Sequence, residues 1–459
     1  MPVLLSLLIF AAAAPPVDTS WGDLAVDLLT RYLQIDTTTP PGNELRGALF
    51  FRELLEAEGV EAVVDEYAPG RANLMAVLKG SGRARPLVLM NHMDVVPADP
   101  ARWSVPPFAG VQKDGRLYGR GAVDMKGEGI VQLVAFLRLV REKRALDRDL
   151  IFLATADEED DFSGIRRVLS PEGFRTAVGR AEYVLTEGGE NRVADDGAPL
   201  YFGVQTAQKS PFWLTLRAIG RPGHGSRPIA DSALNRLVRA LERIRTWRTE
   251  LRVLPSVARF FRDQSTRLSG PEAGWYHDIA QAIQDPAVAR QVYDGDPSLS
   301  ALLRDTVSIT VVKAGYKTNV IPGSAEAELD VRLLPGTDRE EFLARLNAVI
   351  GDPTLEVVPP PRFDPPAESR IDTELFEAIE AALAARYPGV PVTTRMGTGA
   401  TESSLLRPLG IVCYGFTPLL LTTAEDASQH GDDERVPIAS LRESVEIFYE
   451  VVAGITRVR

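Results

Sequence analysis

Hydrophobic residues along the chain follow two kinds of pattern. Apolar positions spaced three and four residues apart predict amphipathic helices over residues 23–35, 44–58 and 127–143. Short continuous apolar runs, of which those beginning at Leu87 and Ile151 are the most regular, predict buried strands. Helices that alternate with buried strands are typical of an α/β domain built around a mostly parallel sheet.

The run that begins at Leu87 is broken by Pro97 and carries His92 and Asp94 near its end. Side chains two residues apart in a strand share a face, so these two point in the same direction. An imidazole beside a carboxylate suits a metal site, but a core histidine next to a turn aspartate fits the pattern equally well. Polar residues elsewhere in the chain favour the metal site over the core histidine.

Acidic residues and histidines recur where predicted strands end. Four acids at 157–160 follow the strand 151–156, and Glu187 follows a further apolar run. A run of acids is usually a solvated loop, yet α/β sheets place their ligand sites at the carboxyl ends of strands. His430 begins another polar segment, and the chain has only four histidines. Packing alone does not readily produce this recurrence.

A glycine-rich loop precedes the helix predicted at 127–143. Gly119 and Gly121 are spaced as in a dinucleotide-binding turn, but Asp124 stands where the third glycine belongs. The strand-then-helix frame of a first βα unit is also missing, which argues against nucleotide binding. Asp124 therefore either caps the helix or binds a metal ion.

Composition narrows the class of protein. The 459 residues are 45% hydrophobic and 25% charged, which suits a globular protein of two or three domains. A net charge of −12 argues against nucleic acid or an anionic membrane as partner. The single cysteine, Cys413, excludes a disulfide framework, and its apolar surroundings favour a packing role over a nucleophilic one.

The first residues resemble a secretory signal. Residues 4–14 are apolar, and small residues at 11–14 precede two prolines, as at a cleavage site. The segment is too short for a stable membrane span. It lacks a Lys or Arg before the apolar run, which leaves a disordered start as the alternative. We expect residues 1–14 to be a signal peptide and the protein to be secreted or periplasmic.

Five short motifs stand in a fixed order along most of the chain. They are His92-x-Asp94, Gly119-Arg-Gly-Ala-Val-Asp124-Met-Lys126-Gly127, Asp157-Glu158-Glu159, Glu187-Gly-Gly and His430-Gly-x-Asp-Glu-Arg-Val. Together they resemble the dinuclear-zinc aminoacylase and carboxypeptidase family, which includes glutamate carboxypeptidase, succinyl-diaminopimelate desuccinylase, acetylornithine deacetylase and carboxypeptidase S. Each motif alone is weak, but five in register are specific.

The resemblance implies two metal ions bridged by Asp124. His92 and Glu187 would complete one site, and Glu159 and His430 the other. Nitrogen and oxygen donors without thiolate suit two Zn²⁺ ions, and Co²⁺ or Mn²⁺ are substitutes that the same donors accept.

Two further residues gain roles from the resemblance. Asp94 would orient His92 and would not bind metal. Glu158 would act as general base beside a water shared by the two zinc ions, and would pass the proton to the leaving amine.

The resemblance also implies two domains. A three-layer α/β/α zinc-peptidase catalytic domain would comprise 20–208 and 362–459, with an inserted α+β lid and dimerisation domain at 209–361. The predicted elements of the insertion have a βαββαβ, ferredoxin-like order. They are interrupted by a helical insert at about 245–305, whose aromatic residues either form its core or line a pocket.

Substrate-binding residues are implied in the inserted domain. Asn319 and Arg332 match family positions that bind the substrate carboxylate, and a guanidinium recognises a carboxylate through two hydrogen bonds. The alternative for Arg332 is a strand arginine paired with Asp330 or Glu328.

Other matches are less regular. His224, in a Gly-His-Gly-Ser motif, would stabilise the oxyanion across a homodimer interface, or it is a turn histidine. Gly399 and Thr401 would contact substrate, although their segment departs from the more usual Gly-Gly-Thr-Asp pattern.

The sequence thus predicts a metal-dependent hydrolase of amide bonds. It would release an amino acid from a dipeptide, a short peptide C-terminus or an N-acyl amino acid. The alternatives are an aminopeptidase that needs a free N-terminus, and a peptide-binding homologue without hydrolytic activity. The intact Glu158 and ligand set argue against the last.

Overall fold

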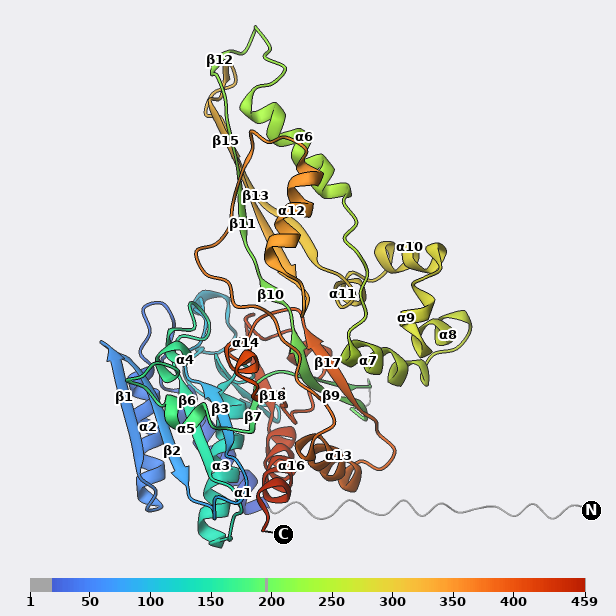
Figure 1. Ribbon diagram of the computed structural model, residues 1–459. Helices are drawn as coiled ribbons and strands as arrows, with labels where there is room; N and C mark the ends of the chain where they lie inside the picture. Colours follow the sequence, from blue (N-terminus) through green and yellow to red (C-terminus); the bar gives the residue numbers. More distant parts are fainter. Residues whose placement is uncertain (1–18, 195–196, 459) are drawn as a thin grey trace, which may run out of the picture. The chain divides into compact units, whose positions relative to one another are not determined.

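The computed structural model describes residues 19–194 and 197–458, and the predicted signal peptide at 1–14 lies outside these ranges. The chain divides into two compact units (Figure 1). The first unit covers the described residues of Met1–Val204, Arg370–Thr393 and Ile411–Arg459, and the second covers Gln205–Ser369 and Thr394–Gly410. The second unit takes in 205–208, 362–369 and 394–410, which the sequence had assigned to the catalytic domain.

A mixed sheet forms the centre of the first unit. Its four middle strands, β6, β3, β7 and β18, are parallel to one another, whereas β2 pairs antiparallel with both β6 and the edge strand β1. Among the described residues the strand order is β1 (Ala62–Ala68), β2 (Arg71–Leu78), β6 (Leu150–Thr155), β3 (Leu87–His92), β7 (Tyr183–Thr186), β18 (Val412–Gly415), β9 (Pro199–Gln208) and β17 (Val392–Gly397), with β8 (Glu190–Val193) paired to β9. The division between the two units falls within β9 and within β17.

Both faces of this sheet are covered. All six residues of β3 are buried, and alternate strand residues point to opposite faces. Leu74 of β2 belongs to the large core shared with α1, α3 and α16, whereas its neighbour Asn73 donates from Nδ2 to the carbonyl of Gly164 in α4. Helices therefore lie on two sides of the sheet, and the predicted α/β fold is confirmed.

In the described part of the first unit the long helices build the main core, and the other helices are short (Figure 1). They are α1 (Thr19–Leu33), α2 (Glu44–Ala57), α3 (Lys126–Glu142), α4 (Ser163–Val168), α5 (Arg175–Val178), α13 (Glu374–Arg386), α15 (Thr423–Asp426), α16 (Ile438–Thr456) and the 3₁₀ turn Pro100–Arg102. A small antiparallel sheet joins β4 (Val111–Lys113), β5 (Arg116–Tyr118) and β19 (Arg435–Pro437). Each helix in the described ranges falls short of the length and apolarity that a membrane crossing requires.

The second unit has a βαββαβ order of elements. They are β11 (Leu214–Ile219), α6 (Ala233–Thr246), β13 (Thr306–Ala314), β15 (Ser324–Leu333), α12 (Arg339–Ile350) and β16 (Glu356–Val358). The antiparallel strands lie in the order β13, β15, β11, β16, with β10 (Ser210–Pro211) also on β15. Buried and accessible residues alternate along β11 and β15, because one sheet face packs on α6 and α12.

Smaller elements complete the second unit. Two short strands, β12 (Gly223–His224) and β14 (Val320–Ile321), pair with each other. A short helix, α14 (Ser403–Leu406), is followed by the 3₁₀ turn Arg407–Leu409.

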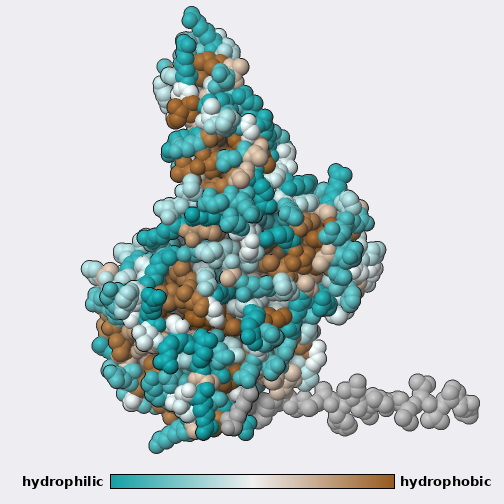
Figure 2. Space-filling view, viewed as in Figure 1, coloured by the Kyte–Doolittle hydropathy of each residue, from teal (hydrophilic) through white to brown (hydrophobic). Residues whose placement is uncertain are grey.

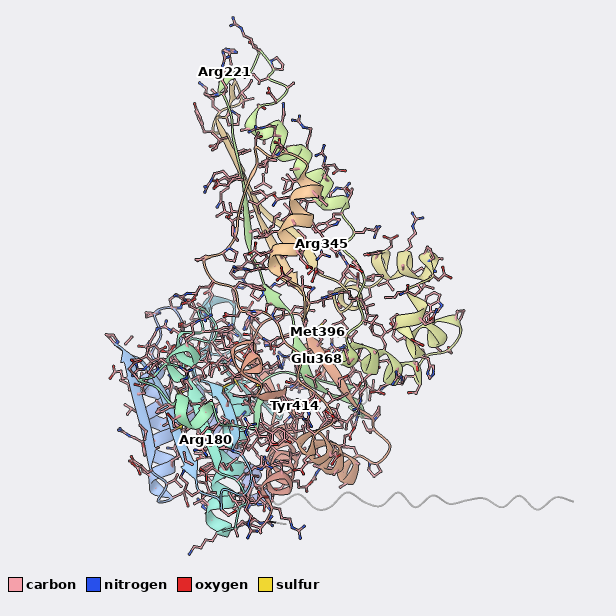
Figure 3. All side chains as sticks on the ribbon, viewed as in Figure 1. Arg180, Arg221, Arg345, Glu368, Met396 and Tyr414 are labelled. Atoms are coloured by element: carbon pink, nitrogen blue, oxygen red, sulfur yellow. The ribbon has the colours of Figure 1, made fainter. Side chains whose placement is uncertain are left out.

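The predicted helical insert consists of α7 (Pro255–Ser265), α8 (Pro271–His277), α9 (Ile279–Ala282), α10 (Pro286–Asp294) and α11 (Pro297–Ala301). Phe261 packs edge-on against Tyr276 at 4.8 Å in a core that also contains Met396 (Figure 3). Glu368, also labelled there, accepts from the amide of Ser256 at 2.7 Å and attaches α7 to the unit.

Apolar residues also reach the surface of this insert (Figure 2). Phe261, Trp275 and Tyr276 line a cavity of about 470 Å³ together with aliphatic and acidic residues of α9 to α11. The insert aromatics are thus both core and cavity wall. Trp247 instead packs against Phe342 in the core beneath the sheet.

Candidate metal centre

Three neighbouring parallel strands deliver polar side chains to one edge of the first unit's sheet. His92 is the last residue of β3, Glu158 and Glu159 follow β6, and Glu187 follows β7. The carboxyl ends of parallel strands meet at the same edge, so these side chains converge although they are up to 95 residues apart in sequence. The strand pattern that predicted the sheet therefore also explains the cluster.

Asp124 lies at the centre of this cluster. Its Oδ1 is 3.0 Å from His92 Nε2, and its Oδ2 is 3.1 Å from His430 Nε2. The His92 Nε2 atom is also 3.5 Å from a Glu187 oxygen, and His430 Nε2 is 3.2 Å from Glu159. One carboxylate therefore lies between two imidazole–glutamate pairs.

The structure settles the alternative role of Asp124 as a helix cap. Helix α3 begins at Lys126, its N-cap position is Met125, and no side chain caps it. The Asp124 carboxylate turns instead toward the two histidines, and Gln429 donates to its Oδ2 at 2.6 Å. Asp124 thus belongs to the cluster and not to the helix terminus.

Asp94 acts on the cluster through two different groups. Its backbone carbonyl is 3.0 Å from His92 Nδ1, whereas its carboxylate oxygen is 3.6 Å away. The carboxylate accepts the backbone amides of Glu158 and Glu159 at 3.1 and 3.0 Å. A proton on His92 Nδ1 that bonds this carbonyl leaves Nε2 with its lone pair toward the carboxylates.

The cluster concentrates negative charge in a largely buried environment. Burial, with repulsion from Glu187, raises the pKa of Glu158 well above its usual value. Burial also raises the pKa of Glu159. Burial opposes a charged His92, but Glu187 and hydrogen bonds to Asp124 and Asp94 hold its pKa well above the usual value.

The second imidazole is affected in the same direction. Hydrogen bonds with Asp124 and Glu159 raise the pKa of His430 to about 10. Each imidazole is therefore drawn toward the charged form by carboxylates on its Nε2 side. A positive charge placed between these atoms is favoured, whether it is a proton or a metal ion.

The residues present fit divalent metal ions. Ligand atoms of His92, Glu158 and Glu187 lie within 4.8 Å of one another, as do those of His92, Asp124 and Glu159. Imidazole nitrogen and carboxylate oxygen without thiolate are donors that suit zinc and its first-row neighbours. The described side chains of this cluster could thus hold a metal ion.

Residues that the sequence analysis did not single out connect the cluster to the protein. Gln429 contacts Asp124 directly. Glu434, fully buried, accepts the backbone amides of Val123 and Asp124 at 2.8 and 3.0 Å. Glu434 stands within the fifth motif, but nothing in its residue type shows which backbone groups it bonds.

The predicted substrate-binding residues all belong to the second unit. Arg332 pairs with Asp330, with Nε–Oδ1 and Nη2–Oδ2 distances of 2.7 and 3.1 Å, as in the alternative interpretation. Its guanidinium also lies 5.8 Å from the centre of the Trp213 ring. Arg332 is thus held on the accessible face of the sheet.

The other predicted residues form two local groups in that unit. Gly225 donates its amide to the Asn319 carbonyl at 2.8 Å, which brings Asn319 next to the segment of His224. His224 Nδ1 accepts from the amide of Ser226 at 3.1 Å, as expected for a turn histidine. The Ser226 hydroxyl lies 2.8 Å from the same nitrogen.

The segment that contains Gly399 and Thr401 is held by a buried amide. Thr401 donates from its hydroxyl to Gln208 Oε1 at 2.9 Å and accepts from Gln208 Nε2 through its carbonyl at 3.0 Å. Arg407 donates to the same Gln208 oxygen at 2.8 Å. These bonds fix the backbone of Thr401.

Residues 88–454 match the model of Peptidase family M20/M25/M40, and the chain therefore belongs to this family. It is a hydrolase of a family of metal-dependent amidohydrolases and peptidases. The family resemblance seen in the five motifs is confirmed.

Relatives extend over most of the chain. It is 27% identical over 405 residues to the N-fatty-acyl-amino acid synthase/hydrolase PM20D1 of Xenopus tropicalis, covering 84% of this chain and 76% of that relative. It is 26% identical over 440 residues to aminoacylase-1B of Rattus norvegicus, covering 95% and 96%. The fold is similar to that of the M20 metallo-carboxypeptidase Sso-CP2 of Sulfolobus solfataricus, with a TM-score of 0.70, 18% identity and coverage of 93% and 98%.

Proposed function

We propose that this protein hydrolyses N-acyl amino acids and releases the free amino acid, with two zinc ions bound at the Asp124 cluster. The observation that carries the proposal is the position of Asp124 between the His92–Glu187 pair and the His430–Glu159 pair. The substrate class is supported by the relatives that are named for N-fatty-acyl amino acids and for aminoacylase activity.

When bound, such ions supply Lewis acidity, which lowers the pKa of water and polarises an amide carbonyl. The chain's own contribution is the proton transfer. Glu158 lies in the same cluster as His92 and Glu187, and is free of a protein hydrogen bond to its carboxylate among the contacts recorded for the described residues. It accepts the proton of the attacking water and delivers it to the leaving nitrogen.

Asp94 holds the residues that take part in this proton transfer in position. Because its carboxylate bonds the amides of Glu158 and Glu159, the two side chains keep a fixed relation to His92. One residue thereby orients an imidazole, a base and a carboxylate ligand.

Release of the C-terminal residue of a short peptide is the second candidate, and similarity to a metallo-carboxypeptidase supports it. Both reactions leave a free amino acid and differ in the acyl part. An aminopeptidase would instead need a free N-terminus. Comparison of an N-acyl amino acid, an N-acetylated dipeptide and the same dipeptide with a free amine separates the three activities.

The experiment is hydrolysis of this panel by zinc-loaded protein, beside protein stripped of metal by a chelator. We expect activity that chelation abolishes and that zinc restores. Glu158→Gln should lower kcat by about 10²- to 10⁴-fold while the variant keeps its metal. Unchanged turnover in this variant would remove Glu158 from the mechanism.

Glu446→Gln is the matched control. Glu446 is a buried glutamate of the first unit that bonds Arg138 at 3.1 Å and has no recorded contact with the cluster among the described residues. This variant should retain turnover. A protein that binds no divalent cation, or that cleaves none of the panel, would contradict the proposal.

A further inference from the structure

The carboxylate of Glu434 gathers donors from a single loop. Its Oε1 accepts the amides of Val123 and Asp124, and its Oε2 accepts the amide of Gly121 at 2.8 Å. Oε2 also accepts from Arg120 Nη1 at 2.7 Å. Both oxygens of a fully buried carboxylate are therefore saturated by the loop that carries Asp124.

Such convergence determines the shape of the loop. A buried amide without an acceptor is destabilising, so three amides that share one carboxylate strongly favour one backbone arrangement. Asp124 is both one of these donors and the central side chain of the cluster. The position of its carboxylate therefore depends on Glu434.

The same glutamate also belongs to the segment that carries His430. It follows His430 by four residues, and its carbonyl accepts the amide of Gly119 at 3.0 Å. Arg120 extends the connection, because its Nη2 donates to the carbonyl of Gly431 at 2.9 Å. The loop with Asp124 and the loop with His430 are thus joined at Glu434.

The two halves of the cluster differ in what holds them. His92 and Glu187 stand at the ends of strands β3 and β7, which pair with each other. His430 stands in a loop with φ +57°, and its side chain is 51% exposed. Strand pairing fixes the first half, whereas the second half depends on contacts between loops.

We infer that Glu434 is a positioning residue that sets Asp124 and His430 relative to one another. It thereby controls the affinity of the site formed by Asp124, Glu159 and His430 more than that of the site formed with His92 and Glu187. This inference rests on the metal centre of the proposed function.

The test is metal binding and does not depend on turnover. Metal-free wild-type protein is titrated with Zn²⁺ by calorimetry, and the bound metal is counted after dialysis. Glu434→Gln places an amide group against donors that a carboxylate oxygen accepted, so the loop loses part of its support. We expect one of the two binding steps, that of the site with Glu159 and His430, to lose about 10- to 100-fold in affinity, with the other step little changed.

Two further variants make the result specific. Glu446→Gln removes another buried glutamate charge that pairs with an arginine in the same unit, and it should leave both binding steps unchanged. Glu434→Asp keeps the charge but shortens the side chain, and should give a smaller loss at the same step. It also serves as the test variant if Glu434→Gln does not fold.

Three results would overturn the inference. Two binding steps of wild-type affinity in a folded Glu434 variant would show that Glu434 does not position the ligands. Equal losses at both steps would show a general structural role, as would a matching loss in Glu446→Gln. Absence of zinc binding by the wild-type protein would instead contradict the proposed function itself.

Discussion

Two groups of buried or half-buried carboxylates in the first unit obtain positive charge in different ways. In one group Arg71 contacts both Glu44, at 3.4 Å, and Asp157. In the other group Asp124, Glu159 and Glu187 have only imidazoles as basic partners among the ion pairs recorded for the described residues. The groups adjoin in sequence, since Asp157 directly precedes Glu158.

The difference indicates which group of carboxylates the chain neutralises with its own side chains. Arg71 also donates to Thr39 Oγ1 and to the Pro41 carbonyl, both at 3.0 Å, so its group is a cross-link between loops. One cation does not serve two acids equally, because burial still raises the pKa of Glu44 to about 7. By the same reasoning, the larger carboxylate group at Asp124 favours a further positive charge, either protons on its two imidazoles or metal ions.

The largest effect should come from the bridging residue. Asp124→Asn removes the charge shared by both halves of the cluster. We expect the affinity for both zinc ions to fall by more than about 100-fold. This loss is larger than is typical for a residue that only supports a ligand. Asp157→Asn, in the Arg71 group, should retain both ions. Calorimetric titration of the two variants measures this contrast, and equal zinc affinities would abolish the distinction between the groups.

Much of this site could be predicted because its motifs follow neighbouring parallel strands. The apolar runs at Leu87 and Ile151 indicate buried strands that pair in parallel. The carboxyl ends of β3, β6 and β7 therefore lie at the same edge of the sheet. Element ends were less accurate, as α1 begins at Thr19 and not at 23. The boundaries depend on capping and tertiary packing, which periodicity does not contain.

Contacts between distant segments could not be predicted. Gln429 and Glu434 reach Asp124 across 305 and 310 residues, and any buried polar side chain could serve as their partner on sequence grounds. The contact of Asp94 with His92 is made by a backbone carbonyl, for which a side-chain motif gives no signal. The contacts of Gln429 and Glu434 depend on where the two loops lie in the fold, which the sequence pattern does not give.

A second prediction concerns the pH dependence of the Arg71 group. The pKa of Glu44 is raised in the folded protein, so its contribution to stability is complete below pH 4.5 and is lost as the pH rises through about 7. The shift corresponds to about 3 kcal/mol at most. Relative to Glu44→Gln, wild-type protein should therefore lose unfolding free energy between pH 4.5 and pH 7. Urea unfolding across this range tests it, and parallel pH profiles would be the contrary result.

Adjacent residues should respond with opposite sign when metal is absent. Asp157→Asn weakens the contact with Arg71 and should lower the unfolding free energy by about 1.5–3 kcal/mol. Glu158→Gln removes a carboxyl group whose charged form is disfavoured by burial and by Glu187, and should raise the melting temperature of metal-free protein. Thermal unfolding after chelation compares the two. A lower melting temperature in both variants would mean that the chain's own groups already neutralise the metal-free cluster.

The smallest effect is expected at Arg332, which, like Arg71, is paired with a carboxylate of the chain. If Arg332 shares its guanidinium with the substrate carboxylate, Arg332→Ala should raise KM for an N-acyl amino acid by about tenfold and leave kcat unchanged. The uncharged carboxamide of the same compound should show no change in KM. Arg217→Ala is the control, since Arg217 pairs with Glu326 on the same sheet. Equal KM values for wild type and Arg332→Ala with both compounds would show that Arg332 only stabilises its strand. It would then resemble Arg71, whose ion-pair partners are carboxylates of the same chain.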